Sequence, residues 1–253
     1  MLFVGVIFDM ADVLYDATLW RRWLLRLVNQ LGVPAEYEPF YHAWDHDYLA
    51  DVHCGRRDYT EAFQTFLLAR GLTWAQVDEV EASSRIQREN LDLNLRPWPG
   101  VVKTIAELGG QGLLLLAWSD ACHPADELAR QLDRLAVGNR FRAVLSSFDI
   151  ECAQPSPQCY QAAVDALGLA AGQTLYVGHD AEHLAAARSF GLRTAAFNFQ
   201  RAARADFYLT RFEDLLPLAK TGSLAPPAPQ QQHPFAPDVR SDPSGLVTQG
   251  NRR

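Results

Sequence analysis

Hydrophobic positions along the chain follow two different patterns, which predict a sheet interrupted by a block of helices. Continuous apolar runs, such as VGVIF at residues 4–8 and LLLLAWS at residues 113–119, are typical of strands that are buried on both faces. Between residues 16 and 95 the apolar positions instead recur at helical spacing, with almost no alternation of β-branched residues. The first strand is therefore predicted to be followed by helices only.

From residue 96 onwards, apolar runs alternate with amphipathic helices. Further strands are predicted at residues 141–147, 174–180, 193–199 and 205–210. This alternation is typical of a parallel sheet that is covered on both faces. We predict an α/β fold in which residues 1–15 and 96–220 form a doubly wound parallel sheet with its helices, and residues 16–95 form an inserted all-helical cap.

The last segment, residues 221–253, has a different composition from both of these parts. It is rich in Pro, Gln, Ser and Gly, and its apolar residues show no periodicity. Such a segment buries too little apolar area to offset the entropy lost on ordering. We expect a disordered tail.

The net charge and the composition of the chain exclude some classes of binding partner. A net charge of −7 argues against binding to nucleic acid or to an anionic membrane surface, because both need concentrated positive potential. No apolar run approaches the roughly 20 residues of a membrane-spanning helix, and the first residues lack a basic region and a cleavage site. The 4 cysteines form no CxxC pair, so we expect reduced thiols. These features predict a cytoplasmic protein whose partners are small molecules or proteins.

Polar residues stand at the ends of the predicted strands, where doubly wound sheets bind their ligands. They comprise Asp9 with Asp12, Ser119 with Asp120, the region 146–157, and the sequence Gly178-His179-Asp180. A strand-end carboxylate, a hydroxyl after an apolar strand and a turn before a helix are the groups that phosphoryl transfer needs. They supply a nucleophile, a phosphate donor and a metal ligand.

In order and content these motifs resemble those of the haloacid dehalogenase (HAD)-like hydrolase superfamily, with a helical C1-type cap inserted after the first motif. IFDMADVLYD resembles the first motif, hhhDxDG[TV]L, and LLLLAWSD resembles the second, an apolar strand ending in Ser or Thr. CAQPSPQCYQAAVDALG resembles the third, a Lys followed by Pro-x-Pro and a helix, and YVGHDAEHLAAARSFG resembles the fourth, hhGDxxxD. The resemblance covers roughly residues 2–218.

The resemblance implies roles for individual residues. Asp9 is the expected nucleophile, which forms an aspartyl-phosphate, and Ser119 is expected to hold a phosphoryl oxygen, with Asp120 and Gln154 as further phosphate-binding residues. A Mg²⁺ site is expected from Asp9 and Asp180, because such sites need only one or two carboxylates. An alternative set adds His179 and His183, and it favours Zn²⁺ or Mn²⁺ over Mg²⁺.

Three departures from the family pattern weaken the expected catalysis. Ala11 stands where the family has its general acid, and losing such an acid costs about 10² to 10⁴ in rate. Asp12 is displaced by one residue, which in an extended segment points its side chain the other way. The third-motif Lys aligns with Gln154, a loss of about 10² to 10³, and the acids of the fourth motif fall on His179 and on His183 or Leu184.

The only lysines of the chain, Lys103 and Lys220, lie far from the third motif in sequence. An arginine of the predicted cap, Arg56 or Arg57, is a candidate replacement for the missing charge. The family's dehalogenases also lack the second Asp and use no metal, but they keep the Lys, so Gln154 counts against that activity.

Two hypotheses remain open. The first is an attenuated hydrolase that uses Asp9 on a small phosphorylated or acyl-phosphate substrate, for which a missing general acid matters less because the leaving group needs no proton. The second is a catalytically inactive member of the superfamily that binds a phosphorylated ligand or a protein partner.

Overall fold

The computed structural model describes residues 3–221. The tail predicted at residues 221–253 therefore lies outside the described residues, apart from Thr221 at the end of the last helix. No helix within residues 3–221 is long and apolar enough to cross a membrane.

The core of the molecule is a six-stranded sheet with the order β3-β2-β1-β4-β5-β6, in which every neighbouring pair is parallel. The predicted α/β fold with a doubly wound parallel sheet is confirmed. The strands are β1 (Gly5–Asp9), β2 (Leu114–Ser119), β3 (Ala143–Ser146), β4 (Thr174–Gly178), β5 (Arg193–Ala196) and β6 (Phe207–Tyr208). The strand order changes direction at β1, because β2 lies on one side of it and β4 on the other. This is the place where such sheets bind ligands.

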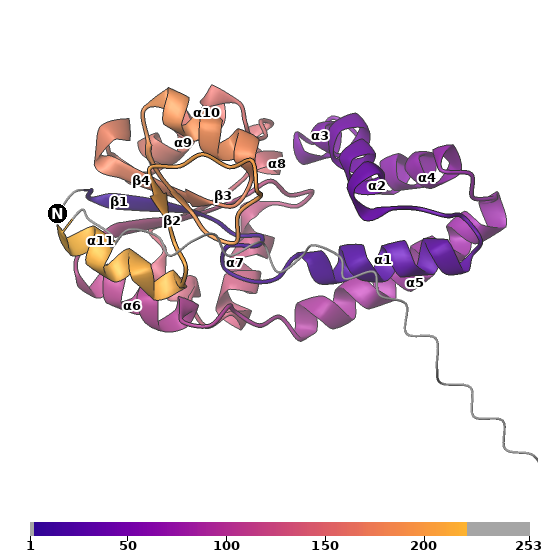
Figure 1. Ribbon diagram of the computed structural model, residues 1–253, viewed down its shortest axis with the longest axis horizontal. Helices are drawn as coiled ribbons and strands as arrows, with labels where there is room; N and C mark the ends of the chain where they lie inside the picture. The colour runs from indigo at the N-terminus through magenta and orange to yellow at the C-terminus, as the bar shows by residue number, and fades with distance from the viewer. Residues whose placement is uncertain (1–2, 222–253) are drawn as a thin grey trace, which may run out of the picture.

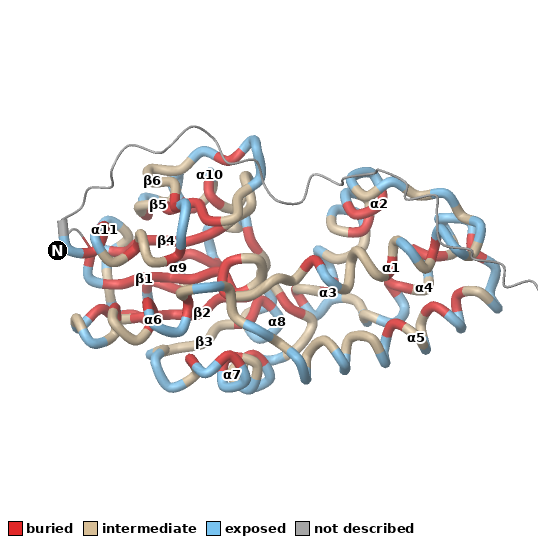
Figure 2. Tube along the Cα trace, turned by 60° about the horizontal axis from the view of Figure 1, so that its bottom comes forward, coloured by how far each residue is buried: buried red, intermediate tan, exposed pale blue. Residues whose placement is uncertain are grey.

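Helices cover both faces of the sheet, as Figure 1 shows. They are α6 (Val101–Gly110), α7 (Ala125–Arg134), α8 (Ser147–Ile150), α9 (Pro157–Leu167), α10 (Ala181–Phe190) and α11 (Leu215–Thr221). Side chains alternate along β1, so that Val6 and Phe8 pack with α6, α7 and α11, whereas Ile7 packs with α9 and α10. The central strands β1, β2 and β4 are consequently buried along almost their whole length (Figure 2).

The helical segment between β1 and α6 forms a second lobe with an apolar core of its own. It contains α1 (Thr18–Gln30), α2 (Tyr37–Trp44), a π-helical turn η1 (Asp45–Leu49), α3 (Ala50–His53), α4 (Tyr59–Ala69) and α5 (Trp74–Leu93). Aromatic rings fill this core, with Trp44 packed between Phe63 and Phe66. Thr73 and Gln76 form a capping box that starts α5. Figure 1 places the lobe beside the end of the sheet where β1 and β2 finish.

Candidate active site

The ends of β1, β2 and β4 bring three of the predicted residues to one edge of the sheet. Asp9 is the last residue of β1 and pairs with Trp118 of β2, so that Ser119 follows directly beside it. On its other side, Phe8 pairs with Val177 of β4, and His179 comes just after that strand ends. Asp9 and Ser119 are both buried. Parallel pairing alone therefore places a carboxylate, a hydroxyl and an imidazole next to one another.

Two groups from the β4 segment approach the same oxygen of Asp9. The Tyr176 hydroxyl donates to Asp9 Oδ2 at 3.5 Å, and His179 Nδ1 lies 3.6 Å from that oxygen. Burial raises the pKa of Tyr176 well above its ordinary value, so the phenol keeps its proton. A Cβ at Gly178 would come within 2.6 Å of the Tyr176 ring, so glycine leaves room for this side chain. The sequence analysis did not identify Tyr176, although it is the one phenol in an otherwise aliphatic strand.

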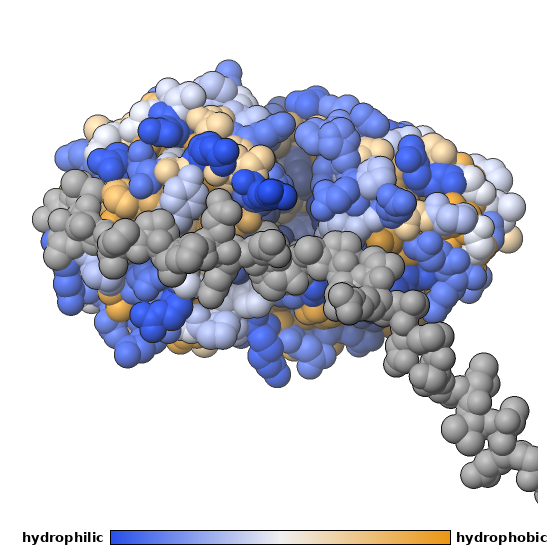
Figure 3. All heavy atoms as spheres, viewed as in Figure 1, coloured by the Kyte–Doolittle hydropathy of each residue, from blue (hydrophilic) through white to orange (hydrophobic). Residues whose placement is uncertain are grey.

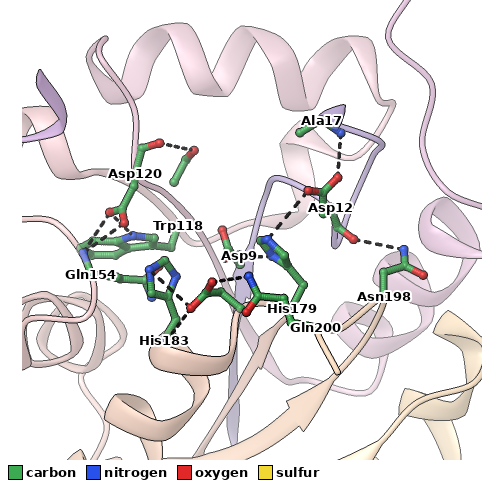
Figure 4. A network of polar contacts seen from close by, with 12 residues as sticks. Asp9, Asp12, Ala17, Trp118, Asp120, Gln154, His179, His183, Asn198 and Gln200 are labelled. Atoms are coloured by element: carbon green, nitrogen blue, oxygen red, sulfur yellow. Dashed lines mark hydrogen bonds and ion pairs between the residues drawn. The ribbon is translucent and has the colours of Figure 1, made fainter. Parts of the chain in front are cut away.

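His179 lies between two carboxylates (Figure 4). Its Nε2 is 3.8 Å from Asp12 Oδ2, while Nδ1 faces Asp9 at an ion-pair distance that leaves this nitrogen without a hydrogen bond. Burial acts to lower the pKa of His179, but contact with Asp9 and the charges of Asp12 and Asp180 outweigh it and raise the pKa to about 9. An imidazolium therefore stands beside the predicted nucleophile at neutral pH.

Asp12 reaches the site by a route that differs from our expectation. We expected an extended segment that points this side chain away, but Asp12 has a φ of 58°, in the left-handed region. Its carboxylate accepts a hydrogen bond from the Ala17 N–H at 2.9 Å, and its carbonyl accepts one from Asn198 Nδ2 at 3.1 Å. The turn directs the other carboxylate oxygen to His179. Ala11 contributes no functional group, so Asp12 is the residue of this turn whose carboxylate faces His179.

Asp120 is tied to the third motif. It accepts hydrogen bonds from the Gln154 N–H at 3.1 and 3.2 Å and from the Trp118 indole at 3.1 Å. Burial and the nearby charge of Asp9 raise its pKa to about 6, although His183 acts in the opposite direction. An ionised carboxylate cannot donate to a phosphate oxygen. These contacts let Asp120 hold the third-motif loop, and its phosphate-binding role stays a prediction.

Ser119 and Gln154 retain hydrogen-bonding capacity for a ligand. The Ser119 hydroxyl makes only a long contact, 3.5 Å, to the Asp120 carbonyl. Gln154 donates through Nε2 to the Tyr176 hydroxyl at 3.0 Å, but its buried Oε1 has no hydrogen-bond partner. Leaving such an acceptor unsatisfied costs about 1–3 kcal/mol. A donor on a bound ligand would remove this penalty.

Asp180 caps α10. Its Oδ1 accepts the N–H groups of Glu182 and His183 at 2.8 and 3.0 Å, and its Oδ2 accepts from Gln200 Nε2 at 2.7 Å. Burial acts to raise the pKa of Asp180, but the charge of His183 and these backbone donors outweigh it, so the pKa is lowered. The carboxylate is therefore ionised, with both oxygens engaged. Neither Gln200 nor Asn198 belongs to a motif, so motif spacing could not predict them.

The chain is similar to known proteins in sequence and in fold. A model of the haloacid dehalogenase-like hydrolases matches residues 3–191. The chain belongs to this family. A phosphoglycolate phosphatase of Pectobacterium atrosepticum is 28% identical over 167 residues, covering 60% of this chain and 70% of that protein. The pyrophosphatase PpaX of Bacillus cereus is 24% identical over 159 residues, covering 58% and 73%.

Among solved structures, a predicted phosphoglycolate phosphatase from Haemophilus somnus superimposes with a TM-score of 0.64 at 17% identity, over 87% of this chain and 99% of that one. This likeness concerns the fold. Together with the family match, it identifies the parallel sheet as part of a HAD-like fold.

The residues of this HAD-like hydrolase do not fit the magnesium site that we expected from Asp9 and Asp180. Both oxygens of Asp180 already accept hydrogen bonds, and the His179 ring lies beside Asp9, with Nδ1 3.6 Å from Oδ2. Within residues 3–221 no group of three or more His, Cys, Asp and Glu side chains is arranged to hold a metal ion. The alternative set with His179 and His183 is not such a group either within residues 3–221. We therefore derive no catalytic step through a metal.

The cap arginines line a cavity between the two lobes. A cavity of about 330 Å³ is bounded by cap residues 52 and 55–59 and by Cys122 and Phe148 of the core. Arg56 pairs with Asp51 at 2.9 Å, and Arg57 pairs with Glu61 at 3.3 Å. Their charge is thus partly offset within the cap. The molecular surface is hollowed between the lobes, and hydrophilic side chains lie along the rim of this hollow (Figure 3).

Proposed function

We propose that this HAD-like hydrolase is a slow, metal-independent hydrolase that acts through Asp9 on a small acyl phosphate. The observation that carries the proposal is the buried Asp9 carboxylate, which faces a protonated imidazole and a phenol on one oxygen and lies beside Ser119. These contacts fall on Oδ2, so Oδ1 is the oxygen that we expect to attack.

The proposed reaction has two steps. Asp9 attacks phosphorus and forms an aspartyl-phosphate, while the carboxylate of the acyl phosphate leaves without needing a proton. Water then hydrolyses the aspartyl-phosphate, which releases phosphate and restores Asp9. The His179 imidazolium offsets part of the charge on the phosphoryl group, and the Ser119 hydroxyl is placed to donate to one of its oxygens.

The choice of an acyl phosphate rests on what the site lacks. Ala11 provides no general acid, so a leaving group that departs unprotonated is favoured. Gln154 provides an amide where the family pattern has a cation, so a reduced rate is expected on any phosphorylated substrate. The relatives named as phosphoglycolate phosphatase and pyrophosphatase support a phosphorylated substrate.

The test compares acetyl phosphate with p-nitrophenyl phosphate as substrates of the wild-type chain and of Asp9→Asn. We expect acetyl phosphate to be hydrolysed faster than the nitrophenyl ester, and faster than by the variant. Chelating divalent ions with EDTA should leave the rate unchanged. Equal rates for the wild type and Asp9→Asn would exclude the proposal, and a strict requirement for Mg²⁺ would exclude its metal-independent form.

A second candidate is an inactive HAD-like protein that binds a phosphorylated ligand or a protein partner. It is favoured by the replacement of three family groups, at Ala11, Gln154 and His179, because such losses compound even if they do not strictly add. Calorimetric binding of inorganic phosphate by the wild-type chain, combined with no turnover of acetyl phosphate, would support this candidate over the hydrolase.

A further inference from the structure

Two cysteine thiols meet next to the candidate active site. Cys152 lies just after α8, and Cys159 lies in the first turn of α9. The Cys159 Sγ donates its hydrogen to the Cys152 Sγ across 3.1 Å. Both are free thiols. The six residues between them contain Gln154.

We infer that Cys152 and Cys159 form a reversible disulfide that clamps the loop carrying Gln154. A disulfide has an S–S length of about 2.05 Å, so the two sulfurs need to approach by only about 1 Å. They already face each other, and Cys152 belongs to a loop outside the sheet. Closing the bond therefore requires a local shift rather than a change of fold.

The two thiols differ in ways that suit the two steps of disulfide exchange. Cys152 is partly exposed, which lets a small oxidant reach it, whereas Cys159 is completely buried. Burial and the hydrogen bond to Cys152 raise the pKa of the Cys159 thiol, which disfavours its thiolate and leaves Cys152 to react with the oxidant first. Cys152 is accordingly the sulfur that attacks first, and Cys159 is the one that completes the bond.

The reaction balances with a small-molecule disulfide such as oxidised glutathione as the oxidant. The Cys152 thiolate attacks one glutathione sulfur, and the S–S bond of glutathione breaks to release the first thiol. Cys159 then attacks the Cys152 sulfur and displaces the second glutathione thiol. The two protein protons pass through solvent to the two glutathione thiolates. Two protein thiols are oxidised and one disulfide is reduced, and excess reduced thiol reverses the reaction.

The disulfide would restrict a loop whose hydrogen bonds connect Gln154 to Asp9. The Gln154 N–H is bonded to both oxygens of Asp120, and its side chain donates to the Tyr176 hydroxyl, which donates to Asp9. Holding residues 152 and 159 together restricts the loop on both sides of Gln154. Formation of the disulfide does not require catalysis at Asp9. The inference can therefore be tested independently of the proposed hydrolysis.

The folded full chain is treated with oxidised glutathione, then unfolded in denaturant so that buried thiols are also alkylated, and digested with trypsin. One tryptic peptide spans residues 143–188 and contains Cys152 and Cys159 but no other cysteine. We expect the number of reactive thiols to fall from 4 to two, and this peptide to be two hydrogens lighter and unalkylated. Dithiothreitol should restore both thiols. Cys152→Ser should abolish the change, whereas the matched control Cys122→Ser, at the cavity, should keep it.

Hydrogen exchange measures the clamping itself. The amides of residues 153, 154, 156 and 158 should exchange more slowly in the oxidised chain, and dithiothreitol should reverse this. Three results would overturn the inference: a 143–188 peptide that stays fully alkylated, a lasting glutathione adduct on Cys152, or a bridge to Cys54 or Cys122. A bridge that forms without slowing exchange would show that it does not hold the Gln154 loop.

Discussion

The two sides of Asp9 handle buried charge in opposite ways. On the β4 side, the His179 imidazolium stands between the carboxylates of Asp9 and Asp12, and its pKa is raised to about 9. On the β2 side, the Asp120 carboxylate receives only neutral donors, from Gln154 and Trp118, and its pKa is raised to about 6 by burial and by Asp9. The β4 side therefore contains a buried cation, His179, whereas the β2 side contains a buried carboxyl group, Asp120, that is partly protonated near pH 6.

This difference explains how the site persists without the groups that the family pattern places there. An unpaired buried carboxylate is costly, so it either acquires a cation or gains a proton. The replacement of a family acid by His179 provides a cation from within the chain. The replacement of the Lys by Gln154 removes one, and Asp120 then titrates at a higher pH. The positive charge beside Asp9 therefore comes from His179, in the fourth motif, whereas the family pattern has a Lys in the third.

The largest effect should come from removing the cation on the β4 side. His179→Gln leaves Asp9 and Asp12 facing each other without a counter-charge, and breaking such a cluster should reduce the free energy of unfolding by about 3 kcal/mol at pH 7. Urea unfolding measures this. The matched control is His183→Gln, whose imidazole lies 4.0 Å from the already capped Asp180 and should matter much less. Equal losses for the two variants would contradict a special role for His179.

Adding a cation on the β2 side should have the next largest effect. Gln154→Lys places an ammonium beside Asp120 and Tyr176, where it can offset phosphoryl charge. We expect turnover of acetyl phosphate to rise about 10²-fold, because one electrostatic donor is worth on the order of that factor. Gln154→Met, which is similar in length but uncharged, is the control and should not gain. A folded Gln154→Lys variant with unchanged turnover would mean that residue 154 does not correspond to the family's lysine.

The pH dependence of stability should reflect the β4 side. The folded pKa of His179, about 9, lies above its ordinary value of 6.5, so its contribution is complete below pH 6.5 and is lost as the pH rises towards 9. Because the side chain is partly exposed, we expect a loss of about 2 kcal/mol across this window, less than the full shift implies. Unfolding curves from pH 6 to pH 9.5 measure it. His179→Gln should flatten the slope, and an unchanged slope would place the titrating group elsewhere.

Much of the fold was predictable from the sequence, because it depends on hydrophobic periodicity. The apolar runs and the helical spacing of residues 16–95 follow directly from which faces are buried. Strand ends were less accurate. The strand predicted at 174–180 stops at Gly178, because the next residues turn and Asp180 caps α10.

The candidate site was predictable only in part, since motif spacing locates residues but not the direction of their side chains. Asp9 and Ser119 are placed by strand pairing, which the motifs imply. The orientation of Asp12 depends on a left-handed backbone at a residue other than glycine, and an extended segment was the reasonable expectation. The Asp180 Oδ2 atom accepts a hydrogen bond from Gln200, which lies in the loop after β5, and no motif includes this loop.

The smallest predicted effect concerns Asp120, on the β2 side. Its substitution should raise the free energy of unfolding, whereas His179→Gln should lower it. The folded pKa of Asp120, about 6, lies above its ordinary value of 3.8, so the unfolded state ionises first and the native state loses stability as the pH rises from about 4 to 6. Asp120→Asn removes that penalty and keeps an oxygen that accepts from Gln154 and Trp118. We expect Asp120→Asn to raise the free energy of unfolding by about 1 kcal/mol at pH 7, and to change this free energy little at pH 4, where Asp120 is largely protonated.

Urea unfolding of the wild-type chain and of Asp120→Asn at the two pH values measures the difference. Asp126→Asn, on the exposed surface of α7, is the control. A loss of stability at pH 7 would show that the negative charge of Asp120 is stabilised, and the two sides of Asp9 would then no longer differ.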